Sequence, residues 1–306
     1  MIRHYIAYDL IFNSELDCPE LPLVADVAAH RLQSDVDVHI RLGLVPEKLK
    51  NPTSGGVVYQ TGTNQFLLSI NNIARYLVQN GNEIIIEPAA HATLNDVRVF
   101  MLGSAFGALL HQRQMLVIHA GAVYTDTGAV LLSGPSGIGK STLLGELLRR
   151  GYPMMVDDVC AVVLDEHNQP QVLPGYPRTR LWADSARKLC VCTENLVRTR
   201  PQLEKYERQL PDQFWSKPAP LRHIYTLSSD NKQSLSVTPL PAIYTFSAVL
   251  HNTYRRAFLD GLEMRQSHFQ LVSAVAASVV VSRVVRPSSS FQLTELADLI
   301  EEDLAA

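Results

Sequence analysis

The sequence lacks a long apolar run, a cysteine framework and an excess of basic residues. Its longest apolar stretch, Leu271–Val285, is interrupted by serines and an arginine, and it is too short and too polar to span a bilayer. The four cysteines contain no Cys-x-x-Cys pair, and Cys190 and Cys192 alone supply too few ligands for a zinc site. These absences exclude a disulfide framework, a zinc module and a membrane-spanning helix.

The charge balance gives no sign of a polyanionic partner. Lys and Arg number 27, Asp and Glu number 30, and the net charge is −3. We therefore expect no nucleic-acid and no membrane partner. The segment Met1–Ile6 runs into polar sequence without the apolar core of a signal peptide, so we expect a cytoplasmic location. With 46% hydrophobic and 19% charged residues, the composition is that of a globular protein.

Residues 1–98 favour β-structure. Val36–Leu42 alternates apolar and polar side chains, as a half-buried strand does. Apolar segments bounded by Gly and Asn-Gly turns predict further strands at Ile6–Phe12, Val57–Gln60, Gln65–Ile70 and Glu83–Pro88. We interpret residues 1–98 as a smaller β-rich N-terminal domain, whose edge strands could pair with an extended peptide.

The pattern changes near residue 95. Asp96–His111 is apolar with helical spacing, and Asn95 is a suitable N-cap. Val117–Tyr124 and Ala129–Ser133 then predict two strands joined by a hairpin turn. Helices and strands alternate from there on, so residues 99–306 are predicted to form an α/β domain.

A glycine-rich segment follows the second of these strands. It matches the Gly-x4-Gly-Lys-Ser/Thr pattern of a phosphate-binding loop with Gly134, Pro135, Ser136, Gly137, Ile138, Gly139, Lys140, Ser141 and Thr142. The glycines let backbone N–H groups turn toward a phosphate chain, and a helix starting near Lys140 adds the positive end of its dipole. Lys140 is expected to face solvent and reach the β- and γ-phosphates, and the Ser141 hydroxyl to bind Mg²⁺. Such a loop predicts nucleotide binding but does not identify the reaction.

Two carboxylates end the next apolar segment. Met154–Val159 predicts a strand beside the one before the loop, with Asp157 and Asp158 directed toward the γ-phosphate. One carboxylate can hold Mg²⁺ and the other can accept a hydroxyl proton, although a lone Asp at a strand end is usually only solvated. His119 lies on the strand before the hairpin, where a histidine is more often a core residue than a catalytic one.

Four segments together resemble the catalytic domain of bacterial HPr serine kinase: His119–Gly121, Gly134–Ser141, Arg150–Tyr152 and Val156–Asp158. The resemblance implies a P-loop kinase core of the phosphoenolpyruvate-carboxykinase-like type that uses ATP and Mg²⁺. It implies Asp157 as general base, Asp158 as a support for the metal together with Ser141, and His119 near the transferring phosphate, with Lys140 among the catalytic groups. HPr kinases are hexameric, so a homo-oligomer is compatible with the resemblance.

The sequence also departs from that family. Thr142 stands where HPr kinases have an acidic residue, and Leu173–Asp184 takes the place of the glycine-rich stretch that supports phosphorolysis. The run Pro174–Trp182 is similar to HPr-kinase-like proteins encoded with ribosomal-peptide clusters. Some of these phosphorylate the C-terminal serine of a lasso-peptide precursor. The segments Tyr8–Leu21 and Leu109–Arg113 are similar to that branch as well.

Charged residues after the loop offer further contacts. Arg178 and Arg180 lie two apart, so in an extended segment they share a face and could clamp a peptide carboxylate or a phosphate; a solvated loop is the alternative. Arg283 and Arg286 end an apolar run and are expected to cap a strand; an approach to the nucleotide is the alternative. The charged segment Leu196–Lys217 is expected to be a solvated face, or else a loop and helix that cover the substrate.

From these observations we predict an ATP- and Mg²⁺-dependent serine kinase that acts on a precursor peptide or a small protein without efficient phosphorolysis. The alternatives are an HPr serine kinase/phosphorylase, a kinase of a small hydroxyl compound such as free serine, and a nucleotide-binding regulatory module or ATPase. The last is disfavoured because the second strand carries Asp157-Asp158 rather than an Asp-Glu pair, whose glutamate normally activates water.

Overall fold

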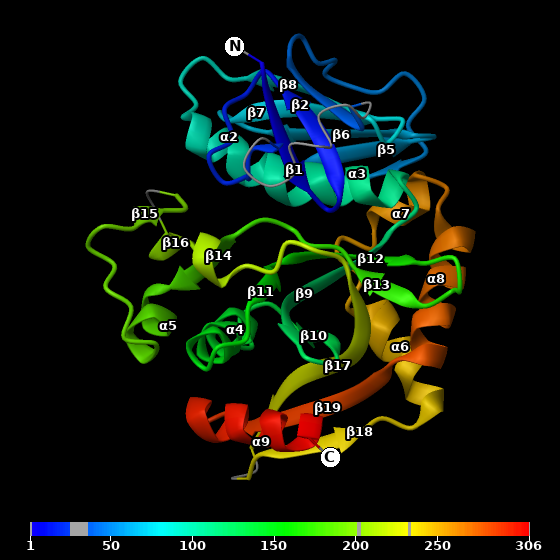
Figure 1. Ribbon diagram of the computed structural model, residues 1–306. Helices are drawn as coiled ribbons and strands as arrows, with labels where there is room; N and C mark the ends of the chain where they lie inside the picture. Colours follow the sequence, from blue (N-terminus) through cyan, green and yellow to red (C-terminus); the bar gives the residue numbers. More distant parts are fainter. Residues whose placement is uncertain (1, 25–35, 201–202, 232–233, 306) are drawn as a thin grey trace. The chain divides into compact units, whose positions relative to one another are not determined.

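The computed structural model describes residues 2–24, 36–200, 203–231 and 234–305. The chain divides into two compact units. The first contains residues 1–117 and 254–271, and the second contains residues 118–253 and 272–306. Both contain strands and helices, so the α/β class expected from the sequence is confirmed at this level (Figure 1).

The first unit is built on one eight-stranded sheet. Its strands are β1 (Arg3–Ala7), β2 (Leu10–Ser14), β3 (Val38–Leu42), β4 (Ser54–Gly55), β5 (Tyr59–Gly62), β6 (Gln65–Ile70), β7 (Ala74–Gln79) and β8 (Glu83–Pro88). They are ordered β1-β2-β3-β8-β7-β6-β5-β4. The expected single strand Ile6–Phe12 is wrong, because Tyr8 and Asp9 have φ of 54° and 58° and form a two-residue hairpin turn between β1 and β2.

A helical segment packs against this sheet. It runs through α2 (Leu94–Phe100), the π-helix η2 (Met101–Ala105) and α3 (Phe106–Gln112), and its N-cap is Thr93 rather than the expected Asn95. The ring of Phe106 stacks on that of Phe12 with centroids 5.0 Å apart. The segment therefore belongs to the first unit, whose boundary lies after Val117 and not at residue 98.

The second unit contains a larger mixed sheet. Its strands are β9 (Leu116–Thr125), β10 (Gly128–Ser133), β11 (Met154–Val156), β12 (Val159–Leu164), β13 (Pro170–Val172), β17 (Ala219–Asp230), β18 (Ser236–Pro239) and β19 (Val280–Pro287). Strands β10, β17 and β19 are parallel neighbours, and β9 pairs antiparallel with both β10 and β11. Strand β9 thus separates β10 from β11, so the expectation that these two are neighbours is wrong.

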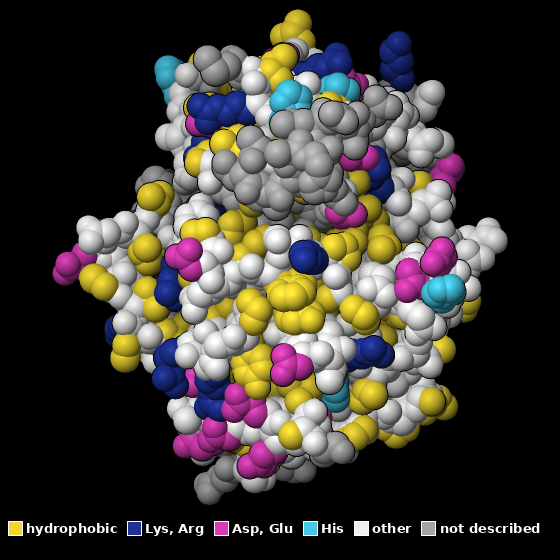
Figure 2. Space-filling model, in the orientation of Figure 1, with side chains coloured by type: hydrophobic (Ala, Val, Ile, Leu, Met, Phe, Trp, Pro, Cys, Tyr) yellow, Lys and Arg dark blue, Asp and Glu magenta, His cyan; other side chains and the backbone are white. Residues whose placement is uncertain are grey.

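Helix α4 (Lys140–Arg149) packs against this sheet and against α9 (Leu293–Ala305), which itself contacts β17. The leucines of α4 share a buried cluster with side chains of β10, β17, β19 and α9. At its other end, the Arg150 guanidinium donates to Glu146, Asp298 and Glu301. Figure 2 shows acidic and basic side chains next to one another over this region. The helix that follows the glycine-rich loop is therefore held along its leucine face and at its C-terminal end.

A small third sheet and the remaining helices complete the chain. The sheet is ordered β14 (Arg178–Trp182), β16 (Lys205–Gln209) and β15 (Val197–Arg198). The remaining helices are α5 (Ala183–Lys188), η3 (Pro211–Gln213), α6 (Ala242–His251), α7 (Phe258–Gly261) and α8 (Arg265–Ser278). The described part of Leu196–Lys217 contains two strands and one short 3₁₀ turn, where the sequence suggested a loop and a helix. Among the described residues, no helix has the length and apolarity needed to cross a membrane.

Candidate functional site

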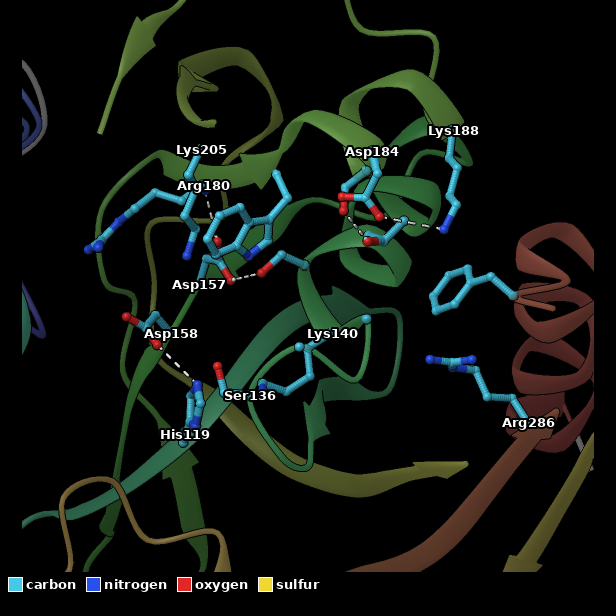
Figure 3. Close-up of a pocket in the computed structure, with 17 residues that line it drawn as sticks. His119, Ser136, Lys140, Asp157, Asp158, Arg180, Asp184, Lys188, Lys205 and Arg286 are labelled. Carbon is cyan, nitrogen blue, oxygen red and sulfur yellow. Dashed lines mark hydrogen bonds and ion pairs between the residues drawn. The ribbon is translucent and has the colours of Figure 1, made fainter. Parts of the chain in front are cut away.

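A cavity of about 290 Å³ opens beside the N-terminus of α4 in the second unit (Figure 3). Most of its polar lining comes from the glycine-rich loop, the region of β11 and β12, and the small sheet with α5, and β9 and β19 add His119 and Arg286. The lining residues that the sequence had singled out as site residues are His119, Ser136, Gly137, Gly139, Lys140, Ser141, Thr142, Asp157, Asp158 and Arg180. The fold thus brings ten of the predicted residues to one place.

The glycine-rich loop has the backbone conformation that its glycines permit. Gly137 and Gly139 have φ of 81° and 111°, and α4 begins at the next residue, Lys140. A Cβ at Gly137 would meet no atom within 4 Å, so this part of the loop faces open space in the cavity. Positive φ angles, a helix N-terminus and open space form a cradle for an anion. Gly134, Pro135 and Ile138 do not line the cavity.

The Lys140 side chain turns back onto its own loop. Its Nζ donates to the carbonyl oxygens of Gly134 (2.8 Å) and Pro135 (3.0 Å), and the residue is only 7% exposed. The expectation that Lys140 faces solvent is therefore wrong. Burial lowers the pKa of Lys140, and the charges of Asp158 and Asp157 oppose this shift. The ammonium group lies in the cavity wall, held by neutral acceptors that a phosphate oxygen could replace.

Asp157 is tied into the site by both carboxylate oxygens. Its Oδ1 accepts a hydrogen bond from Ser141 Oγ (3.1 Å), and its Oδ2 accepts from Thr179 Oγ1 (2.8 Å) and from the backbone N–H of Arg180 (3.1 Å). Asp157 lies in a bend between β11 and β12, not at the end of one continuous strand. The bend lets it link the glycine-rich loop to the small sheet.

Asp158 makes a different set of contacts. Its Oδ1 lies 3.1 Å from Nε2 of His119. Burial would raise the pKa of Asp158, but the hydrogen bond with His119 and the charges of Arg180 and Lys205 outweigh it, so its pKa is below the usual range. The backbone of Asp158 has φ of 84°, a strained angle for a residue with a side chain. The backbone turn at this position leaves the carboxylates of Asp157 and Asp158 facing different partners.

The two arginines of the small sheet are placed differently. Arg178 is buried, and its guanidinium donates to Glu207 (3.0 Å) beneath the Tyr176 ring. Arg180 lines the cavity. The expected clamp of two arginines is therefore wrong for Arg178, which is held in an internal ion pair. Arg180 alone is available to a ligand.

Seven further residues line the cavity that the sequence did not identify as site residues: Trp182, Asp184, Ser185, Lys188, Lys205, Arg286 and Phe291. Lys205 Nζ lies 5.5 Å from the centroid of the Trp182 ring, on the neighbouring strand of the small sheet. Three of them lie in segments that the sequence had singled out: Arg286 at the end of an apolar run, Trp182 in Pro174–Trp182 and Lys205 in Leu196–Lys217. Asp184, Ser185 and Lys188 lie on α5 and Phe291 in a loop, where no local pattern indicated a site.

The oxygen donors suit a hard cation. Ser141 Oγ and the Asp157 carboxylate lie together at the start of α4, and Mg²⁺ prefers such ligands combined with phosphate oxygens and water. No group of three or more His, Cys, Asp or Glu side chains in the described ranges is arranged to hold a metal by itself. Ser141 and Asp157 are thus the residues that could hold a magnesium ion together with phosphate oxygens.

The comparisons with known proteins do not assign this chain to a family. No protein-family model matches the chain, and no curated protein matches it. Among solved structures, the HPr(Ser) kinase/phosphatase from Coxiella burnetii matches with a TM-score of 0.35 and 13% identity, over 62% of this chain and 90% of that chain. At these values the likeness carries no argument about the fold, the residues or the activity of this chain.

Proposed function

We propose that this protein is an ATP- and Mg²⁺-dependent kinase with a P-loop core of the phosphoenolpyruvate-carboxykinase-like type. One observation carries the proposal. The phosphate-binding loop, the Ser141–Asp157 pair and the His119–Asp158 pair line the same cavity. Phosphoryl transfer needs little covalent chemistry from the protein; it needs these groups held around the transferring phosphate.

The loop and the Ser141–Asp157 pair would hold the donor. Backbone N–H groups of the loop and the Lys140 ammonium would bind the phosphates in place of the carbonyls that Lys140 now contacts. Ser141 and Asp157 would hold Mg²⁺. When bound, this ion supplies charge neutralisation on the phosphate oxygens. Arg180 and Lys205 would add positive charge on the side of the two carboxylates.

The contacts favour the His119–Asp158 pair as the proton acceptor. The sequence resemblance implied Asp157 in this role, but both Asp157 oxygens accept hydrogen bonds from its neighbours. Asp158 is kept ionised and lies 3.1 Å from an imidazole nitrogen, so the pair can take a hydroxyl proton and hold the resulting positive charge. We therefore assign metal support to Asp157 and proton transfer to His119 with Asp158.

For the acceptor we propose a serine of a peptide or small protein, with a peptide that ends in serine as the first choice. Arg180 offers a guanidinium that can bind a carboxylate through two parallel hydrogen bonds. The same cation could bind the phosphate of a small-molecule acceptor. HPr and free serine are therefore the alternative acceptors to be compared.

The experiment incubates the protein with ATP and Mg²⁺ and with HPr, peptides ending in serine, the same peptides amidated, or free serine. Mass spectrometry locates any added phosphate. We expect phosphate on the serine-ended peptides, less on the amidated ones, and no efficient reversal with inorganic phosphate. Hydrolysis of ATP with no acceptor modified would contradict the kinase proposal. Phosphate on HPr alone, removed again with inorganic phosphate, would instead identify a bifunctional HPr enzyme.

A further inference from the structure

One end of the cavity is not used by the proposed chemistry. Figure 3 shows Lys188 and Arg286 on one side of Lys140, and His119 and Asp158 on the other. Phe291, which also lines the cavity, packs on the glycine-rich loop so closely that a Cβ at Gly139 would overlap its ring atoms Cε2 and Cζ. An aromatic ring therefore lies directly beside the phosphate cradle.

Two cations flank this ring. The Arg286 guanidinium carbon lies 4.8 Å from the ring centroid of Phe291, and Lys188 Nζ lies 5.0 Å from it. Arg286 donates only to backbone carbonyls, those of Ile138, Pro287 and Ser290, and in the described part of the chain no carboxylate pairs with it. Burial accordingly lowers the pKa of Arg286. Lys188 is 3.7 Å from Asp184, an exposed pair that contributes little.

We propose that Phe291, Arg286 and Lys188 form the nucleoside end of the donor site, where the ring and the guanidinium plane contact the base and the cations face the α-phosphate. This inference rests on the proposed function, because it presupposes a triphosphate on the loop. A flat aromatic and guanidinium surface binds any nucleobase by stacking. The positive charges of Arg286 and of Lys188, whose ion pair with Asp184 is an exposed one, favour an anionic ligand beside it.

The position of the three residues separates this role from acceptor binding. The acceptor must reach the γ-phosphate next to His119 and Asp158, whereas the nucleoside must leave the phosphate chain at its other end. Phe291 contacts Gly139, the residue before α4, and Arg286 Nε donates to Ile138 O (3.3 Å). Both residues thus lie where the bound phosphate chain would continue away from the carboxylates.

The test measures binding by calorimetry with two probes, ATP and inorganic tripolyphosphate, in the presence of Mg²⁺. Tripolyphosphate contains the phosphate chain without a nucleoside. Phe291→Leu should weaken ATP binding about tenfold and leave tripolyphosphate binding within about twofold, because one stacking contact is lost. Phe291→Tyr should retain both affinities. Lys140→Ala should weaken both probes, and Phe269→Leu, which changes an exposed ring of α8, should change neither.

Each possible result either supports or contradicts the assignment of Phe291 to the nucleoside end of the donor site. Selective loss of ATP affinity in Phe291→Leu, with Phe291→Tyr unchanged, supports the inference. Equal loss of both probes, loss of neither, or a wild-type protein that binds tripolyphosphate as tightly as ATP overturns it and leaves the kinase proposal standing. A wild-type protein that binds neither probe contradicts the proposed function itself. Thermal unfolding of each variant shows whether Phe291→Leu is folded. If it is not, Phe291→Met, which keeps an apolar side chain but removes the ring, carries the test with the same expected selective loss of ATP affinity.

Discussion

Asp157 and Asp158 are adjacent in the sequence but differ in what they contact. Asp157 accepts hydrogen bonds from Ser141, Thr179 and the backbone of Arg180, whereas Asp158 faces His119. The positive φ of Asp158 accounts for the divergence, because it turns the backbone between two short strands. We therefore assign the chemical role of each carboxylate from its contacts and not from its position in the sequence.

We expect the asparagine variants of these residues to separate the two roles. Asp158→Asn should lower phosphate transfer about 10²–10⁴-fold, the usual worth of a general base, while ATP binding is retained. Asp157→Asn should shift the Mg²⁺ concentration needed for half-maximal transfer to a higher value. Magnesium titrations of both variants check this. Normal transfer by Asp158→Asn, or an unchanged Mg²⁺ requirement in Asp157→Asn, would reverse or remove the assignment.

The loop residues were predictable because their spacing is local. Six of the nine loop residues line the cavity, and their arrangement follows from glycine conformations and a helix start. The partners of Asp157, Arg178 and Phe291 were not predictable, since each depends on a segment distant in sequence. The Arg178 ion pair with Glu207 requires two strands to be in register, and the sequence does not state that register.

The helices and strands with strong local sequence patterns were predicted correctly. The alternating strand Val38–Leu42, the hairpin of β9 and β10, and the start of α4 near Lys140 follow from local sequence patterns, and Gly151, with φ of 100°, follows the end of α4. Strand β7 was missed, and the helical segment after residue 93 contains a π-helix that a single helical period does not reveal. Tertiary packing, and not the local sequence pattern, determines the conformation of these two segments.

Helix α3 carries a buried titratable group, His111. Its Nε2 is 2.8 Å from Tyr254 O, and its Nδ1 has no hydrogen-bond partner among the residues that the structure describes. Burial lowers the pKa of His111 to about 4. The unfolded chain takes up this proton near pH 6.5, so the folded state binds fewer protons between pH 6.5 and 4. The free energy of unfolding should fall across this range as pH falls, by about 3 kcal/mol from this group.

His111→Gln keeps a side-chain donor near Tyr254 but does not titrate. We expect its free energy of unfolding to fall less between pH 7 and pH 4 than that of the wild type. Urea denaturation at both pH values measures this difference. The exposed His167 supplies the control, and His167→Gln should behave like the wild type. A pH dependence of His111→Gln equal to that of the wild type would show that other groups determine it.

The first unit is built from two segments that are far apart in the sequence, and this limits where the chain can be truncated. Tyr254–Leu271 belongs to the first unit although it lies far along the sequence. Phe258 packs on Phe66 with ring centroids 4.4 Å apart, and Phe106 stacks on Phe12. A fragment of residues 99–306 therefore keeps Phe106 and Phe258 without the strands that cover them. The whole chain, not the C-terminal part, is the unit that folds.

We expect such a fragment to bind a hydrophobic dye and to aggregate, since exposed aromatic surface is available for association. Size-exclusion chromatography and dye fluorescence, compared with the full chain, test this. A monomeric fragment with a cooperative thermal transition would show that residues 99–306 fold independently.

The attachment of α4 at both ends has a consequence for how a ligand would be bound. Thr142 Oγ1 donates to Ser185 Oγ (2.7 Å) in the first turn, and Arg150 joins the far end to α9. The backbone that would wrap the phosphates thus loses its conformational freedom when the chain folds, and not when the ligand arrives. Phosphate association should therefore carry a small entropic penalty from the protein, and a fast association step with no prior ordering of the loop.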